Sequence, residues 1–229
     1  MPIQNRVDPW GNILAVSARG TFLGNRGILH NEKQQIVKPY QHQSWVTCRL
    51  KFKNRKRRIM SPGAYTELFF LDEATAFAAG HRPCGECRRE RYIKFKDLWV
   101  RANLKNQANE IKISVINRTM HKERIHKRVK VTYKTYIKDL PDGTIFSDNG
   151  SAYLVFNDKI YLWSFEGYRL LDTVNFADKV DVLTPQSIVN IFKMGFLPGV
   201  HDSVISQLYQ HGRGFRYRSS HAGYTPVNL

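Results

Sequence analysis

The chain has 229 residues, of which 42% are hydrophobic, and this composition excludes a disordered chain because it suffices for a sizeable core. No stretch approaches about 18 apolar residues, and the N-terminal segment lacks the apolar core of a leader peptide. We therefore expect no membrane insertion and a cytoplasmic location. With three cysteines in that setting, the thiols are expected to be reduced.

The net charge of +17 is concentrated in one part of the chain, since residues 49–138 hold 24 Lys and Arg against 8 Asp and Glu. A basic balance confined to one segment predicts a surface that binds a polyanion, and nucleic acid is the expected partner. The alternatives are a solvated charged face without a partner and, less favoured, an anionic membrane surface.

The N-terminal segment predicts short strands and tight turns, with a strand over residues 13–17. Three glycines follow at short intervals: Gly20, Gly24 and Gly27. Glycine lets backbone amides approach a phosphate, and Arg19 and Arg26 lie close by in the sequence. No strand-to-helix nucleotide-binding pattern surrounds these residues, so tight turns are the favoured interpretation.

A basic hairpin is predicted next. Residues 43–53 alternate as a strand does, with Cys48 on the apolar side. The run from Arg49 to Arg58 carries seven basic residues in ten, and the turn at residues 61–63 precedes a second apolar strand over 67–71.

Three helices are expected in the middle of the chain. The first covers residues 74–79, between the N-cap residue Asp72 and the terminating Gly80. The second runs from Glu86 to about Arg101, with apolar residues at three- and four-residue intervals and basic residues elsewhere on its circumference. The third, also basic, covers residues 113–130.

Beyond the turn at residues 141–143, strands are predicted over 144–147, 152–156, 160–164 and 180–183, and one helix follows Thr184-Pro185. The expected fold class is α+β, a small zinc-stapled strand and helix unit followed by a β-rich lobe with one helix. The expected domains are a zinc-knuckle domain at 1–101, a basic helical connector at 102–138, the β-rich lobe at 139–210 and a flexible basic tail at 211–229.

The Cys84-x-x-Cys87 motif predicts a metal site, because a turn brings residues three apart to the same side, and tetrahedral Zn²⁺ is the commonest occupant. The rival interpretation is a thioredoxin-like redox pair. That alternative is disfavoured because the motif follows one predicted helix and opens another, rather than following a strand of a βαβ unit.

The stretch from Thr66 to Arg89, with its two Phe residues, Ala-rich helix and Arg-Pro-Cys-Gly-Glu-Cys-Arg motif, resembles the zinc-binding domain of Ada-type DNA alkylation-response proteins. Cys48-Arg49 resembles the upstream Cys-Arg of that family, and the likeness covers residues 45–91. The whole chain, from Asn5-Arg-Val to Leu183-Thr-Pro, resembles a group of bacterial proteins of unassigned function.

The resemblance implies that Cys48, Cys84 and Cys87 bind zinc and that Cys48 is also an alkyl acceptor. The family's second cysteine falls at Phe52, which cannot bind a metal. The fourth ligand is therefore expected to be a histidine or water. His81 is the first candidate, although it occupies the position of a family Phe, and His42 is a weaker one.

The expected nucleic-acid contacts are the basic residues around this knuckle, which would face the phosphate backbone. They are Arg49, Lys51, Lys53, Arg55, Lys56, Arg57, Arg58, Arg82, Arg88, Arg89 and Arg91.

The leading functional hypothesis is a zinc-containing nucleic-acid-binding protein, with DNA favoured over RNA and DNA repair or defence as the setting. The first alternative is an enzyme acting on DNA, either through alkyl transfer to Cys48 or as a nuclease or glycosylase. Acid or base groups for the latter would come from Glu67, Asp72, His121 and His126. The second alternative is a protein-interaction module.

Overall fold

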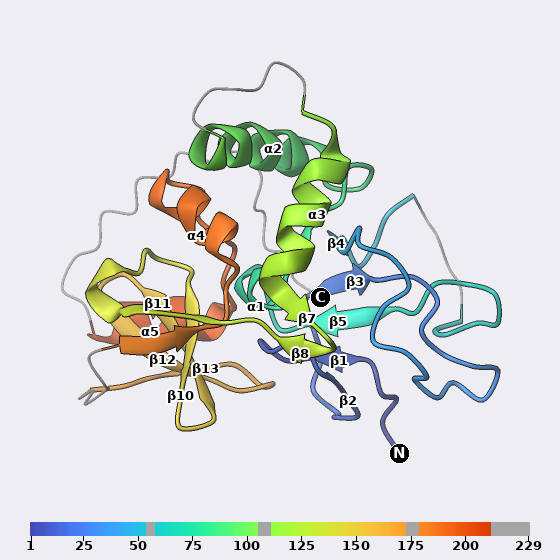
Figure 1. Ribbon diagram of the computed structural model, residues 1–229. Helices are drawn as coiled ribbons and strands as arrows, with labels where there is room; N and C mark the ends of the chain where they lie inside the picture. Colours follow the sequence, from blue (N-terminus) through green and yellow to red (C-terminus); the bar gives the residue numbers. More distant parts are fainter. Residues whose placement is uncertain (54–57, 105–110, 173–178, 212–229) are drawn as a thin grey trace.

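The computed structural model describes residues 1–53, 58–104, 111–172 and 179–211, and these form an α+β fold of two six-stranded sheets and five α-helices (Figure 1). Within those ranges no helix is long and apolar enough to cross a membrane. The α+β class predicted from the sequence is confirmed.

The N-terminal sheet mixes parallel and antiparallel pairs in the order β2-β1-β5-β3-β4-β6. Its strands are β1 (Arg6–Val7), β2 (Ile13–Leu14), β3 (Phe22–Asn25), β4 (Val46–Cys48), β5 (Leu68–Phe70) and β6 (Arg82–Pro83). The pairs β1–β5 and β4–β6 are parallel, so segments far apart in the sequence become neighbours. Gly24 of β3 packs against the Phe70 ring, which a Cβ would meet at 2.3 Å, and this contact accounts for one glycine of the predicted turn region.

The C-terminal sheet is antiparallel throughout, in the order β13-β12-β11-β10-β14-β9. Its strands are β9 (Tyr133–Tyr136), β10 (Ile145–Asp148), β11 (Ser151–Phe156), β12 (Lys159–Trp163), β13 (Tyr168–Leu170) and β14 (Lys179–Val182). The turns β10–β11 and β11–β12 place Asn149-Gly150 and Asn157-Asp158 at positive φ, as their residue types predict.

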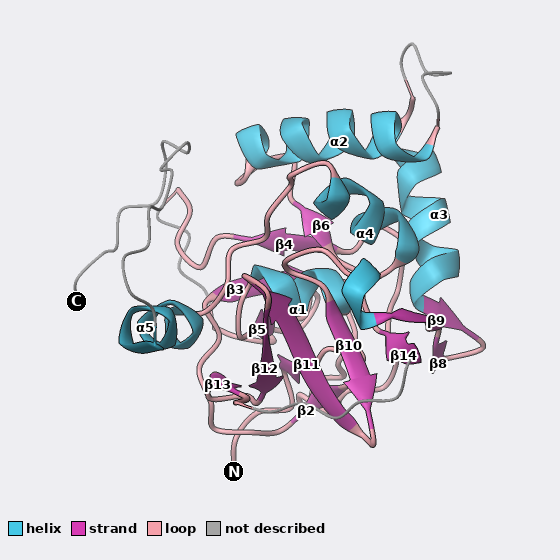
Figure 2. Ribbon diagram, turned by 90° about the vertical axis from the view of Figure 1, so that its left-hand side faces the viewer, coloured by secondary structure: helices cyan, strands magenta, loops and turns pink. Residues whose placement is uncertain are grey.

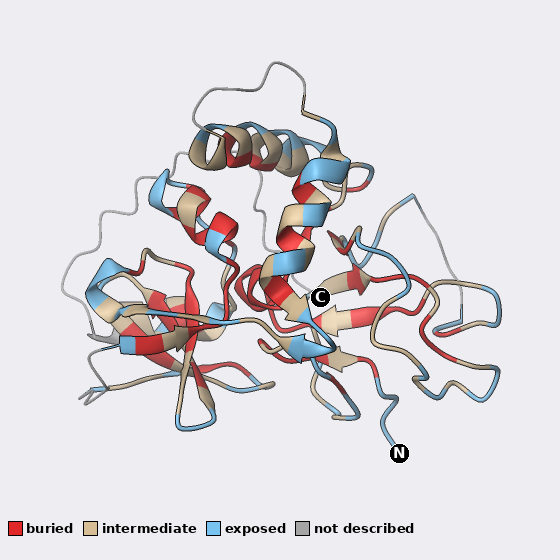
Figure 3. Ribbon diagram, viewed as in Figure 1, coloured by how far each residue is buried: buried red, intermediate tan, exposed pale blue. Residues whose placement is uncertain are grey.

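The helices are α1 (Glu73–Ala78), α2 (Arg89–Asn103), α3 (Ile113–Arg124), α4 (Gln186–Lys193) and α5 (Asp202–His211), with a 3-10 turn at Ile137–Asp139. Figure 2 shows α1 in the centre of the molecule, below α2 and beside strands of both sheets. Every residue of α1 is buried, and its alanines allow this close packing (Figure 3). Asp72 caps it by accepting a hydrogen bond from the Thr75 amide at 2.8 Å.

The hydrophobic core is continuous between the two predicted lobes. One cluster joins Leu71, Ala74 and Ala78 to Ile145, Leu154 and Tyr161 of the C-terminal sheet. A second cluster packs α2, α3 and α4 together around Trp99 and Phe192. The lobes are therefore fixed relative to one another through α1.

Two sequence-based expectations about helices are wrong. The helix predicted over 113–130 ends at Arg124, and the strands β7 (Ile125–His126) and β8 (Val129–Lys130) form a hairpin whose turn places Lys127 and Arg128 at positive φ. The C-terminal lobe has α5 as a second helix, anchored by the buried Val204. The tail expected over 211–229 lies outside the described residues, apart from His211.

Candidate metal centre

Parallel pairing of β4 with β6 brings the first cysteine to the second. Val46 pairs with Arg82 and Thr47 with Pro83, and the Cys84 amide donates to the Thr47 carbonyl at 2.9 Å. Because the two strands run parallel and end together, Cys48 and Cys84 lie next to each other at the carboxyl ends of these strands. Backbone hydrogen bonds between β4 and β6 thus bring together two cysteines that lie 36 positions apart in the sequence.

The turn after β6 adds the third thiol. The sulfurs of Cys48, Cys84 and Cys87, here called the cysteine cluster, all lie within 4.8 Å of one another. The Glu86 amide donates to the Cys84 sulfur at 3.4 Å, and the Arg49 amide donates to the Cys87 sulfur. A tetrahedral ion with metal–sulfur bonds of about 2.3 Å needs sulfurs about 3.8 Å apart, so the cluster fits such an ion.

The three thiols are electrostatically coupled. Hydrogen bonding with Cys84 and Cys87 raises the pKa of Cys48, while hydrogen bonding from Cys48 and Cys87 lowers the pKa of Cys84. One sulfur can therefore be anionic while its neighbours keep their protons. A bound cation relieves this crowding because it attracts all three sulfurs at once.

The cluster is partly open to solvent, because Cys48 and Cys84 are half-buried whereas only 7% of Cys87 is exposed. In the described parts of the chain no histidine, aspartate or glutamate joins the three cysteines. The cluster could hold a metal ion with three protein ligands, which leaves the fourth position of a tetrahedral ion to water or another molecule.

His81, the first candidate for the fourth ligand, is not part of the cluster. It is fully buried, its Nε2 atom accepts a hydrogen bond from Arg26 Nε at 3.2 Å, and its ring packs 4.6 Å from that of Phe70. Burial and the charges of Arg26 and Arg124 hold the pKa of His81 well below its ordinary value. His81 therefore fills a packing position in the core. His42, the weaker candidate, is exposed and outside the cluster.

Three of the predicted nucleic-acid contacts are engaged within the protein. Arg82 is 5% exposed and donates to Asn117 and Ser44. Arg88 and Arg91 form ion pairs of 2.6 and 2.7 Å with Glu73, a buried residue of α1. These arginines hold α2 and β6 against the rest of the molecule, and we withdraw them from the expected nucleic-acid surface.

The remaining predicted contacts fall into two sets. Arg49, Lys51, Lys53, Arg58 and Arg89 are exposed, and Lys53 lies 3.6 Å from the equally exposed Glu86. Arg55, Lys56 and Arg57 lie outside the described residues. The Glu67 and Asp72 side chains bind backbone amides of Met60 and Thr75, as structural carboxylates do.

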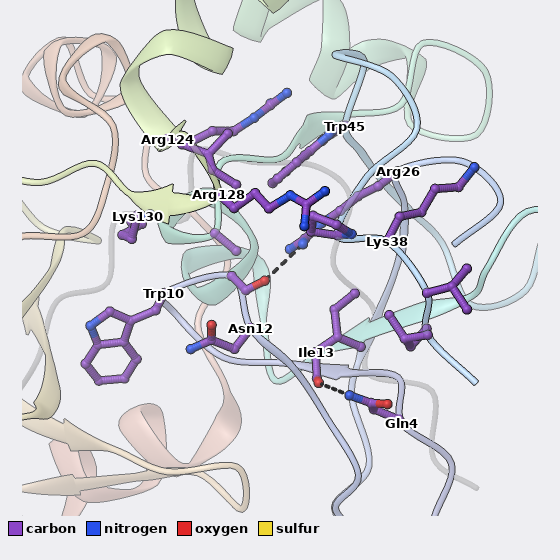
Figure 4. A pocket seen from close by; sticks show the side chains of 16 residues that line it. Gln4, Trp10, Asn12, Ile13, Arg26, Lys38, Trp45, Arg124, Arg128 and Lys130 are labelled. Carbon is purple, nitrogen blue, oxygen red and sulfur yellow. Dashed lines mark hydrogen bonds between the residues drawn. The ribbon is translucent and has the colours of Figure 1, made fainter. Parts of the chain in front are cut away.

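Sequence reasoning missed a second candidate site, a cavity of about 390 Å³ that is lined in part by Trp45 (Figure 4). Its most buried charged wall residues are Arg26 and Arg124. Arg124 continues the buried stripe of Ile116 and Met120 at four-residue spacing along α3. A charged residue on an apolar helical stripe is the signal that could have identified it.

Comparison with known proteins adds no relative, since no family model, no curated protein and no solved structure matches the chain.

Proposed function

We propose that this protein binds zinc through the cysteine cluster and nucleic acid, DNA in particular, through the exposed cations beside it. The observation that carries the proposal is the position of those cations next to metal-ligating residues. Arg49 directly follows Cys48, and its amide donates to the Cys87 sulfur. Arg89 follows Cys87 by two residues at the first turn of α2. A metal ion would hold both arginines in a fixed relation.

The test is binding of a labelled duplex and a labelled single strand, measured by fluorescence anisotropy at several salt concentrations. Affinity should fall linearly on a log–log plot, because phosphate contacts release counterions. Arg49→Gln and Arg89→Gln should each reduce the slope by about 1. Arg169→Gln, an exposed arginine of β13 in the other sheet, is the matched control and should leave the slope unchanged. Absent or salt-independent binding would refute the proposal.

A second candidate function is alkyl transfer to Cys48, which the resemblance to Ada-type domains suggests and the partial exposure of Cys48 favours. In this reaction the Cys48 thiolate forms a sulfur–carbon bond with the methyl group of a DNA phosphotriester. The carbon–oxygen bond breaks, and its electron pair stays on the phosphodiester. Incubation with methylated DNA should add one methyl group to the wild type and none to Cys48→Ser. Equal labelling of both proteins would exclude this function.

A further inference from the structure

The cavity beside Trp45 has a cationic wall. Among the described residues that line it, five are basic and none is acidic: Arg26, Lys38, Arg124, Arg128 and Lys130. They come from β3's end, the 36–39 segment, α3 and the β7–β8 hairpin. In Figure 4, Arg26 and Arg128 point toward each other in the centre of the view, while Lys38 points away from them. We call this site the cationic cavity.

Arg26 forms the floor of the cationic cavity. It is 1% exposed, its Nη1 atom donates to the Gly11 carbonyl at 2.9 Å, and its Nε atom donates to His81. Its Nη2 atom is buried and, in the described part of the protein, has no hydrogen-bond partner. A buried, unpaired donor on a guanidinium costs free energy that an anion in the cavity would recover.

Arg124 and Trp45 build the adjoining wall. The guanidinium carbons of Arg26 and Arg124 lie 4.0 and 3.8 Å from the centre of the Trp45 ring. Arg124 also donates to the carbonyls of Gly80 and Gln43, at 2.7 and 2.8 Å. These contacts fix the orientation of two cations before any ligand arrives.

The charge of this wall is not neutralised. Lys130 donates to the Ala78 carbonyl, and the nearby carboxylate is Asp8, which acts on Arg26 and Lys130 from outside the lining. Asp8 is itself occupied by hydrogen bonds from Asn12 at 2.9 Å. Burial lowers the pKa of Arg26 to about 9 against the opposing charge of Asp8, and burial together with the charges of Arg26 and Arg124 lowers the pKa of Lys130 to about 7.

We propose that the cationic cavity binds the phosphate group of a small phosphate monoester of nucleotide size. A phosphate monoester carries a charge of about −1.5 to −2 at neutral pH, which matches several cations better than a single carboxylate does. The volume of about 390 Å³ suits a small ligand. The remaining lining is aromatic or aliphatic and would contact the organic part: Trp10, Ile13, Ile36, Val37 and Pro39. This site is separate from the proposed nucleic-acid surface and does not depend on it.

The test is isothermal titration of the full-length protein with adenosine 5′-monophosphate, inorganic phosphate and adenosine. The monophosphate should bind saturably and adenosine should not, because the phosphate supplies the charge. A 5′-phosphorylated oligonucleotide then identifies the source of the phosphate. Competition with the monophosphate would assign the cavity to a nucleic-acid end, and absence of competition would assign it to a free nucleotide.

Two variants locate the site. Arg128 is exposed at the mouth of the cavity, so Arg128→Gln should leave folding intact and weaken binding about 10-fold. Lys127→Gln is the matched control, because Lys127 precedes it in the same turn and does not line the cavity. Arg26→Met should weaken binding about 10-fold to 100-fold, with near-ultraviolet circular dichroism reporting that the fold is retained.

The proposal is overturned if neither phosphate-bearing probe binds the wild type, or if Lys127→Gln weakens binding as much as Arg128→Gln. Loss of nucleic-acid binding in Arg49→Gln with unchanged binding of adenosine 5′-monophosphate would show that the two sites are independent.

Discussion

Two pairs of arginines in the described part of the protein differ in the groups that surround them. Arg88 and Arg91 surround Glu73, whose Oε2 atom also accepts a hydrogen bond from the Gly199 amide at 2.9 Å. Arg26 and Arg124 have carbonyl groups and the Trp45 ring around them instead. The arginines of the first group share a buried carboxylate that binds both of them, whereas those of the second group donate to neutral carbonyl groups. Arginines thus make structural ion pairs in one region and form the proposed receptor for an anion in the other.

The largest effect is expected from removing the carboxylate of the first group. Glu73→Gln leaves two arginines without their counter-charge and should lower the free energy of unfolding by about 3 kcal/mol, measured by urea denaturation. Asp97→Asn, which breaks the exposed pair with Arg101, is the control and should change little. A Glu73→Gln variant as stable as the wild type would show that the two groups do not differ as described.

The Glu73 contribution also depends on pH. Burial raises the pKa of Glu73, but the charges of Arg88 and Arg91 outweigh it and bring the pKa to about 2, below the ordinary value of 4.5. The folded state therefore binds fewer protons, and this stabilisation is present above about pH 4.5 and is lost as the pH falls toward 2. The stability difference between the wild type and Glu73→Gln should shrink over that range.

In the second group, burial of the Lys130 ammonium is expected to destabilise the folded protein, whereas Glu73 stabilises it. Burial, together with the charge of Arg26, lowers the pKa of Lys130 to about 7 from its ordinary 10.5. Between these values the unfolded chain binds more protons, so this residue makes stability rise with pH from 7 to about 10. Lys130→Met should be relatively most stable near pH 7 and lose that advantage as the pH rises. An advantage that does not change with pH would mean that Lys130 is not desolvated in the folded protein.

The smallest effect is expected at the surface. Arg89→Gln should change the free energy of unfolding by less than about 0.5 kcal/mol, because the side chain is exposed. Arg88→Gln, one position earlier, should destabilise the protein, since Arg88 binds Thr47 and the buried Glu73. The unfolding temperatures of the two variants therefore distinguish an exposed cation from a cation that makes structural contacts.

Local patterns in the sequence predicted much of the fold. The cap of α1, the apolar spacing of α2, the turns of the C-terminal sheet and the convergence of Cys84 with Cys87 each depend on neighbouring residues. Cys48, the third member of the cysteine cluster, was predicted from the resemblance to a family and not from neighbouring residues. Long-range pairing of β4 with β6 is the physical reason for its position.

The properties that depend on distant partners were not predictable. Nothing near Arg88 or Arg91 in the sequence indicates that Glu73 would meet them, since α1 and α2 approach through tertiary packing. His81 lies three residues from Cys84, but the strand between them turns its ring toward Arg26 and Phe70. A count of basic residues therefore overestimates the cations that are free to bind a ligand.

Metal analysis of the purified protein tests the central proposal, that three cysteines from two segments of the chain bind one zinc ion. The wild type should contain one zinc per chain by elemental analysis, and Cys84→Ser should contain none while keeping the side-chain volume. Wild type without metal after purification in zinc-containing buffer, or equal zinc in both proteins, would contradict the account.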